Sequence, residues 1–155
     1  MRKFIVVLLI AVCCFSRLTA QTTEDSVKAV VNRLFEGMKS ANPDIMKEVF
    51  ADSAILQTIA RSREGKMVIM TDHPSKFIQS VGSLKPGAAD ERIEFETVRI
   101  DGPLAIVWTP YQFYFDGKFS HCGVNSFQLV RLNGQWKIQY LIDTRRRTGC
   151  EGGQK

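Results

Sequence analysis

The residues of this sequence best suited to acid–base chemistry or to ligand contacts lie in its last third. His121 can accept a proton and the Tyr140 hydroxyl can donate one, which are the two roles that an isomerase or dehydratase needs. Asn125 offers an amide, which forms hydrogen bonds but cannot take up a proton. Trp108 and Phe127 add aromatic surface for stacking on a flat ligand. These residue types leave two hypotheses open, proton transfer and the binding of an aromatic ligand.

Other signatures of chemistry are absent from the sequence. The chain has no nucleophile elbow, no glycine-rich phosphate loop and no metal-ligand spacing. His73 precedes a proline and is expected at the surface, and Asp72 is expected to cap a helix. We therefore expect neither a metal nor a cofactor.

The candidate residues belong to a stretch whose apolar residues alternate with a period of two. Four strands are predicted near residues 92–100, 104–115, 118–132 and 135–144. The turns between them are Asp101-Gly102, Asp116-Gly117 and Asn133-Gly134, all of which are typical of tight hairpins. The last of these joins the two longest strands.

Helices are predicted upstream of these strands. Apolar residues recur at three- and four-residue steps to about residue 40, Asn42-Pro43 begins a second helix, and Thr71-Asp72 caps a third that runs to about residue 81. Short strands are expected at 54–59 and 67–70, and a loop at 85–90. Helices followed by a meander indicate an α+β fold with three N-terminal helices on one face of a curved antiparallel sheet.

Tight turns set the strand register, so the two faces of the sheet can be sorted. Pro110 opposite Gly123 is the one place where a bulge is expected, and a bulge there would exchange Tyr111 and Cys122 with Gln112 and His121. The helix-facing side is predicted to hold Ile93, Phe95, Ile106, Trp108, Asn125, Phe127, Leu129, Trp136, Ile138, Tyr140 and Ile142.

The sorting selects ligand-binding candidates on the inner face, which are Trp108, Gln112, Tyr114, Asn125, Phe127 and Tyr140. It places the carboxylates Glu94, Glu96 and Asp143 outside. Without an inward carboxylate, the pair His121 and Tyr140 is the remaining catalytic hypothesis. The alternative for the aromatic residues is that they are ordinary core residues.

The outer face is predicted to be half polar and half apolar. An exposed apolar patch on a sheet is typical of an interface, so we expect a homodimer through this face. The patch is predicted to consist of Val107, Tyr111, Phe113, Phe115, Val124 and Leu141.

The first 20 residues read as a secretory signal peptide. Arg2 and Lys3 precede an uncharged apolar run over residues 4–15, which is too short to span a membrane, and cleavage is expected near Ala20. A lipoprotein signal is the competing interpretation because Cys13 and Cys14 lie late in the run, although no small residue precedes them. We expect residues 21–155 to form a single exported domain, periplasmic or secreted, without stable membrane insertion.

Charge and cysteine content fit an exported protein. Loss of Arg2, Lys3 and Arg17 with the signal lowers the formal charge from +5 to +2, which argues against a nucleic-acid partner. The basic run at residues 145–147, Arg145, Arg146 and Arg147, reads either as a solvated strand end or as an anion site. Two cysteines remain, and an oxidising compartment predicts a disulfide between Cys122 and Cys150, with two unpaired thiols as the alternative.

The order of elements, together with the ending LVRLNGQWKIQYLIDTRRR, resembles the nuclear transport factor 2-like (NTF2-like, SnoaL-like) superfamily. Within it, HCGVNSFQLV, GQWKI and DTRRRTGC look like an exported bacterial family labelled "putative lumazine-binding". The resemblance implies a cone-shaped curved sheet wrapped round helices with a pocket at its wide end. Three functions are compatible with it: binding of a small aromatic molecule, an isomerase or dehydratase of the ketosteroid-isomerase-like class, and a non-catalytic interaction module.

Overall fold

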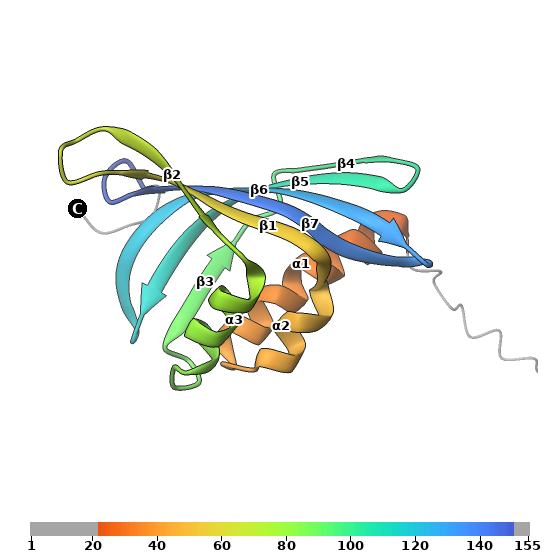
Figure 1. The fold of residues 1–155 in the computed structure, drawn as a ribbon, viewed down its shortest axis with the longest axis horizontal. Helices are drawn as coiled ribbons and strands as arrows, with labels where there is room; N and C mark the ends of the chain where they lie inside the picture. Colours follow the sequence, from red (N-terminus) through yellow and green to blue (C-terminus); the bar gives the residue numbers. More distant parts are fainter. Residues whose placement is uncertain (1–21, 151–155) are drawn as a thin grey trace, which may run out of the picture.

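The computed structural model describes residues 22–150, so the predicted signal peptide lies outside the described residues. Three helices, α1 (Thr23–Lys39), α2 (Pro43–Val49) and α3 (Pro74–Gly82), pack against one side of a curved sheet (Figure 1). No helix in this part of the chain is long and apolar enough to cross a membrane.

Local sequence signals explain where each helix begins. Thr22 and Asp25 form a reciprocal capping box at α1, and the Asn42 side chain accepts hydrogen bonds from two backbone amides at the start of α2. The cap of α3 is His73, whose Nδ1 accepts from the amide of Ser75. The expectation that Thr71-Asp72 caps this helix is therefore wrong, because β2 extends through Asp72 and leaves the next residue to begin the helix.

The sheet has seven strands in the order β2-β1-β7-β6-β5-β3, with β4 also paired to β5. It is mixed, because β1 runs parallel to β7 while every other pairing is antiparallel. The predicted strand at 92–100 is two strands that are interrupted opposite Pro110, which has no N–H for a ladder. The strands are β1 (Phe50–Arg61), β2 (Met67–Asp72), β3 (Ala89–Ile93), β4 (Thr97–Asp101), β5 (Leu104–Phe115), β6 (Lys118–Leu132) and β7 (Gln135–Arg146).

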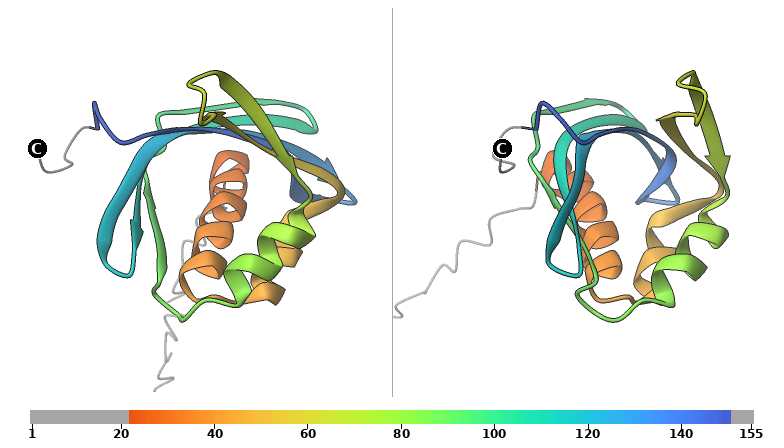
Figure 2. Two further views of the ribbon diagram at one scale, coloured as in Figure 1. Left: turned by 60° about the vertical axis from the view of Figure 1, so that its left-hand side comes forward. Right: turned by 90° about the vertical axis from the view of Figure 1, so that its left-hand side faces the viewer.

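The sheet curls round the helices, and α1 lies inside its concave side in both views of Figure 2. The core fills the space between them. Its fully buried residues come from α1, α2 and the middle of the long strands, and include Val31, Met46, Val107, Phe127 and Ile138. In this arrangement α3 and the β1–β2 pair lie toward one edge of the sheet, and the β5–β6 hairpin curls round toward the other (Figure 2).

The strand register departs from the sequence-based prediction at two bulges. The turns at 116–117 and 133–134 pair as predicted, but the ladders shift by one residue near Ser120 in β6 and near Gln139 in β7. The first hairpin turn is centred on Gly102-Pro103 rather than Asp101-Gly102. Because side chains alternate with a period of two, each one-residue shift moves the following side chains to the other face.

Because of the two shifts, several residues lie on the face of the sheet opposite to the predicted one. On β5, Val107 and Tyr111 are buried under the helices, whereas Ile106 and Trp108 point outward and are 44% and 43% exposed. Val107, Tyr111, Phe113 and Leu141 therefore do not belong to an outer patch, since they contribute to the core or to the cavity described below. On β7, Asp143 lies inside, and Tyr140 and Ile142 lie outside.

The bulge expected at Pro110 and Gly123 is not there, because Pro110 pairs with Val124 and Gly123 with Tyr111. Gly123 is required for a different reason, which is that a side chain would not fit there. A Cβ at this position would lie 1.8 Å from the Thr144 carbonyl oxygen and 2.8 Å from the Tyr111 ring. The glycine thus lets the Tyr111 ring cross β6 and reach β7.

Candidate functional site

A cavity of about 320 Å³ lies between the helices and the concave face of the sheet. Its helix side is mainly apolar, with Phe35 and Met38 of α1 and Phe77 and Val81 of α3, and α3 also contributes Lys76 and Ser80. Its sheet side carries a band of polar groups. A cavity with an apolar wall and a few convergent polar groups is the usual form of a small-molecule site.

The polar wall is built by a cross-strand row on the concave face. Thr109, Asn125, Asp143 and Thr58 follow one another across β5, β6, β7 and β1 as register partners. The neighbouring row toward the core is apolar, with Val107, Phe127, Leu141 and Leu56. Polar groups are thus confined to one band across an otherwise apolar surface.

Three donors hold the carboxyl group of Asp143 in place. Thr58 Oγ1 donates to Oδ1 at 2.6 Å, and Arg145 Nε donates to Oδ2 at 2.8 Å. The Tyr111 hydroxyl lies 3.2 Å from Oδ2 and 2.9 Å from the backbone oxygen of Thr144, and its single proton serves one of them at a time. Burial and the nearby carboxylates raise the pKa of Tyr111, so it stays a neutral donor. Asp143 is thereby fixed in position.

Glu91 provides a second carboxyl in a different environment. Its Oε1 accepts a hydrogen bond of 2.8 Å from Asn125 Nδ2, and this hydrogen bond favours the charged form of Glu91. Burial raises the pKa of Glu91 to about 7, and the charge of Asp143 contributes to the rise. The cavity thus contains two carboxyl groups, one held by three donors and one that titrates near neutral pH.

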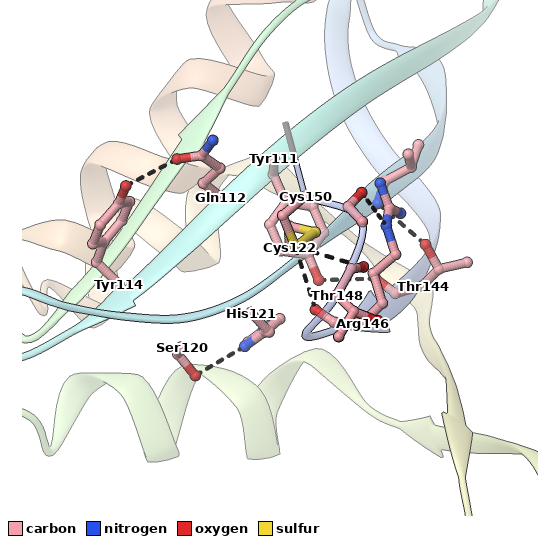
Figure 3. The surroundings of a disulfide bond; sticks show 12 residues. Tyr111, Gln112, Tyr114, Ser120, His121, Cys122, Thr144, Arg146, Thr148 and Cys150 are labelled. Carbon is pink, nitrogen blue, oxygen red and sulfur yellow. Dashed lines mark hydrogen bonds between the residues drawn. A yellow bond between two sulfur atoms is a disulfide. The ribbon is translucent and has the colours of Figure 1, made fainter. Parts of the chain in front are cut away.

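His121 lies at the edge of the cavity, next to the disulfide. Its ring is 5.0 Å from that of Phe113 and 5.7 Å from that of Tyr111, and its Nδ1 lies 3.1 Å from Ser120 Oγ (Figure 3). Burial lowers its pKa, and the charges of Arg145 and Arg147 lower it further. The imidazole is therefore favoured in its neutral form.

The predicted disulfide between Cys122 and Cys150 is confirmed. It ties the segment after β7 to β6, beside Arg146, which pairs with Cys122 in the ladder (Figure 3). The disulfide thus covalently links the parts of β6 and the segment after β7 that lie next to the lining residues His121 and Arg145.

The predicted ligand residues separate into three groups. Asn125 lies in the cavity wall as expected, and its binding role stays a prediction. Phe127 is fully buried in the core behind the wall. Trp108, Gln112, Tyr114 and Tyr140 are not on the inner face. Trp108 points outward because of the bulge near Ser120, and Tyr114 donates to Gln112 Oε1 at 2.9 Å on the same outer side (Figure 3).

The catalytic pair of the sequence hypothesis is separated by the sheet. His121 lines the cavity, whereas the Tyr140 hydroxyl donates to Gln57 Oε1 at 2.6 Å on the outer face. The statement that no carboxylate points inward is also wrong, since Glu91 and Asp143 both do. Glu91 could have been found from the alternation, because it lies two residues before Ile93 and so shares its face. The inward position of Asp143 could not have been found from the sequence, because the bulge near Gln139 leaves no signature in the residue types.

Within the described residues, no group of three or more histidine, cysteine or acidic side chains could hold a metal ion. One buried polar atom has no hydrogen-bond partner there, the hydroxyl oxygen of Thr109, which lies beside Asn125 in the polar row. The arrangement can therefore offer a ligand hydrogen bonds and proton transfer.

Solved structures with this architecture define the class of protein. An NTF2-like protein of unknown function from Shewanella baltica OS155 matches with a TM-score of 0.62 at 15% identity, covering 79% of this chain and 93% of that one. A cystatin-like-fold domain of unknown function from Nostoc punctiforme matches with a TM-score of 0.63 at 17% identity, covering 84% of this chain and 80% of that one. An NTF2-like protein from Streptomyces avermitilis, described as a putative dehydratase, matches with a TM-score of 0.58 at 11% identity, covering 79% of this chain and 95% of that one. The fold is that of the NTF2-like superfamily.

Residues 22–140 match the model of the family described as "Putative lumazine-binding". The chain belongs to this family, which agrees with the resemblance seen in its sequence. No curated protein matches the chain.

Proposed function

We propose that the protein binds a small planar heterocycle of the lumazine type in the cavity between α1, α3 and the sheet. The observation that supports this most directly is the two-sided lining of the cavity. Phe35 and Phe77 provide apolar surface for a ring, and the facing wall ends in Asn125 and Glu91. The family description points to the same class of ligand.

The polar wall suits the edge of such a ring. Pteridine-type heterocycles alternate N–H donors with carbonyl and ring-nitrogen acceptors. Glu91 near its pKa can accept or donate a proton, and Asn125 combines an acceptor oxygen with an amide already engaged with Glu91. The stacking partners in this proposal are residues of the helices, in place of Trp108 and Phe127. The presence of a cavity weighs against an interaction module whose pocket is filled by its own side chains.

Binding is tested by titrating the protein with lumazine and following both ligand fluorescence and the melting temperature. We expect saturable binding and a rise in melting temperature with concentration. Asn125→Ala should weaken binding at least tenfold, while Ser126→Ala, its neighbour on the outer face, should leave it unchanged. No stabilisation by any aromatic heterocycle, or equal affinity of the two variants, contradicts the proposal.

A second candidate function is proton transfer by an isomerase or dehydratase, favoured by the environment of Glu91. A carboxyl whose pKa burial raises to about 7 is a base well matched to neutral conditions. Glu91 takes the place that the sequence hypothesis gave to His121. Exchange of a proton next to a carbonyl, followed by NMR in D₂O with a panel of cyclic ketones, should accelerate as pH rises through about 7. Glu91→Gln should abolish the acceleration, and its persistence would exclude this base.

Export to an oxidising compartment is supported by the disulfide and by the N-terminal sequence pattern. The test is the mass of the protein recovered from the periplasm or medium of an expressing bacterium. Cleavage after Ala20 gives a chain that begins at Gln21. Retention of the intact chain in the cytoplasm would refute export.

Homodimerisation through the outer sheet face is also proposed, with a corrected set of residues. Ile55, Ile106 and Trp108 are 43–45% exposed there. Three consecutive cross-strand rows over β5, β6, β7 and β1 contain no charged residue, so two copies can face each other without like-charge repulsion. The rows are Ile106, Gln128, Tyr140 and Ile55; Trp108, Ser126, Ile142 and Gln57; and Pro110, Val124, Thr144 and Ile59.

Light scattering at micromolar concentration should give twice the mass of one chain. Trp108→Lys should shift the species to a monomer because it brings a charge into the middle of the face. The control is Leu132→Lys, which introduces the same charge at an exposed residue of the hairpin tip. A monomeric wild-type protein rejects the dimer.

A further inference from the structure

Arg145 holds a special position at the rim of the cavity. It follows Asp143 by two residues on β7, lines the cavity, and keeps half of its side chain exposed to solvent. One side of the guanidinium is fixed from within, because Nε donates to Asp143 and Nη2 donates to Thr58 Oγ1 at 3.2 Å. The group is thus oriented by the polar wall itself.

This orientation leaves hydrogen-bonding capacity directed away from Asp143. A guanidinium has five N–H donors in a fixed plane, and two of those of Arg145 are used among residues 22–150. The other three, including both on Nη1, have no protein acceptor in that range. A planar carboxylate matches two donors of a guanidinium in parallel, which is the geometry that distinguishes arginine from lysine.

The charges around the rim limit the ligand to an anion of low charge. Arg145 forms an ion pair with Asp143, and burial raises the pKa of Glu91 to about 7, which reduces its negative charge at neutral pH. The charge of Arg145 lowers the pKa of His121 more than the charge of Asp143 raises it, and the charge of Arg147 lowers this pKa further. The cavity lining also includes Lys76, which is paired with Asp72. A dianionic phosphate would therefore meet two cations that are already paired and three carboxyl groups, so a carboxylate is the better match.

We infer that the ligand of this cavity is a heterocyclic acid whose carboxylate pairs with Arg145 at the rim while its neutral ring lies between the helices and the polar wall. The inference rests on the proposed binding of a heterocycle and adds the chemical class of the substituent. It makes Arg145 the residue that determines specificity, and it gives the first arginine of the basic run a role that Arg146 and Arg147 do not share. Arg146 Nε donates instead to the Gly149 carbonyl oxygen, outside the cavity lining.

The test compares two ligands that differ only in the carboxylate, lumazine and lumazine-6-carboxylate, by fluorescence titration at pH 6.5 and low salt. We expect the wild-type protein to bind the carboxylate at least tenfold more tightly than lumazine. Arg145→Gln should remove this preference while still binding lumazine, which also shows that the variant is folded. Arg147→Gln, with the same loss of charge on an exposed neighbour, should keep most of the preference.

The possible results separate the two proposals. Equal affinity of the two ligands for the wild-type protein, or weaker binding of the carboxylate, overturns the inference and leaves heterocycle binding intact. A preference that survives Arg145→Gln also overturns it. If the wild-type protein binds neither lumazine nor lumazine-6-carboxylate, both the proposed function and the inference that rests on it are refuted.

Discussion

Replacement of Glu91 by glutamine should change the pH dependence of stability in a defined way. The folded protein holds the pKa of Glu91 at about 7, whereas an unfolded chain returns it to the ordinary value of 4.5. A raised folded-state pKa means that stability from this group is complete below about pH 4.5 and is lost as pH rises to about 7. The shift corresponds to roughly 3 kcal/mol between those limits.

Glutamine keeps the shape of the side chain and can still accept the hydrogen bond from Asn125, but it does not ionise. Glu91→Gln should therefore match the wild-type protein near pH 4.5 and be more stable by up to about 3 kcal/mol at pH 8. In a domain of this size such a difference raises the melting temperature by roughly 10 °C.

Urea unfolding of both proteins at half-unit steps from pH 4.5 to 8.5 measures this difference, and other titrating groups cancel in the comparison. Glu94→Gln, an exposed carboxyl three residues further on, is the matched control and should give curves parallel to wild type. A constant difference between Glu91→Gln and wild type across the range would refute the assignment of a buried, near-neutral carboxyl.

Three further substitutions test how the site is held. Gly123→Ala should destabilise the fold by at least about 3 kcal/mol in urea, because its Cβ would overlap the Thr144 carbonyl oxygen; a smaller loss means that the strands part easily. Tyr111→Phe should cost about 1–2 kcal/mol and weaken the positioning of Asp143, which an unchanged unfolding curve would contradict. Cys150→Ser opens a loop of 28 residues and should cost roughly 3–4 kcal/mol under oxidising conditions, with no difference from wild type under reducing ones.

The sequence predicts the architecture well because its signals are local. The capping box at Thr22, the Asn42-Pro43 helix start and the Asn133-Gly134 turn each act within a few residues, and each appears in the structure. The parallel pairing of β1 with β7 could not be read in the same way, because its partners are more than 80 residues apart.

The candidate site was predicted less well because it depends on register. Asn125 and His121 lie on the cavity face as predicted, because β6 has no extra residue between them and the core residue Phe127. Trp108 was misplaced because the extra residue near Ser120, on the partner strand β6, shifts every pair beyond it by one residue. Tyr140 was misplaced because the extra residue near Gln139 lies between it and the 133–134 turn. Neither serine nor glutamine marks a bulge by its type, so only the pairing in the folded sheet identifies them.

The bulge near Gln139 decides which chemistry β7 presents to the cavity. With it, Leu141 and Asp143 face inward; without it, Tyr140 and Ile142 would take their places. A deletion of one residue at this point would thus replace a carboxylate by aromatic and aliphatic side chains without a single substitution. The same scaffold can in this way exchange an acidic lining for an apolar one through chain length alone.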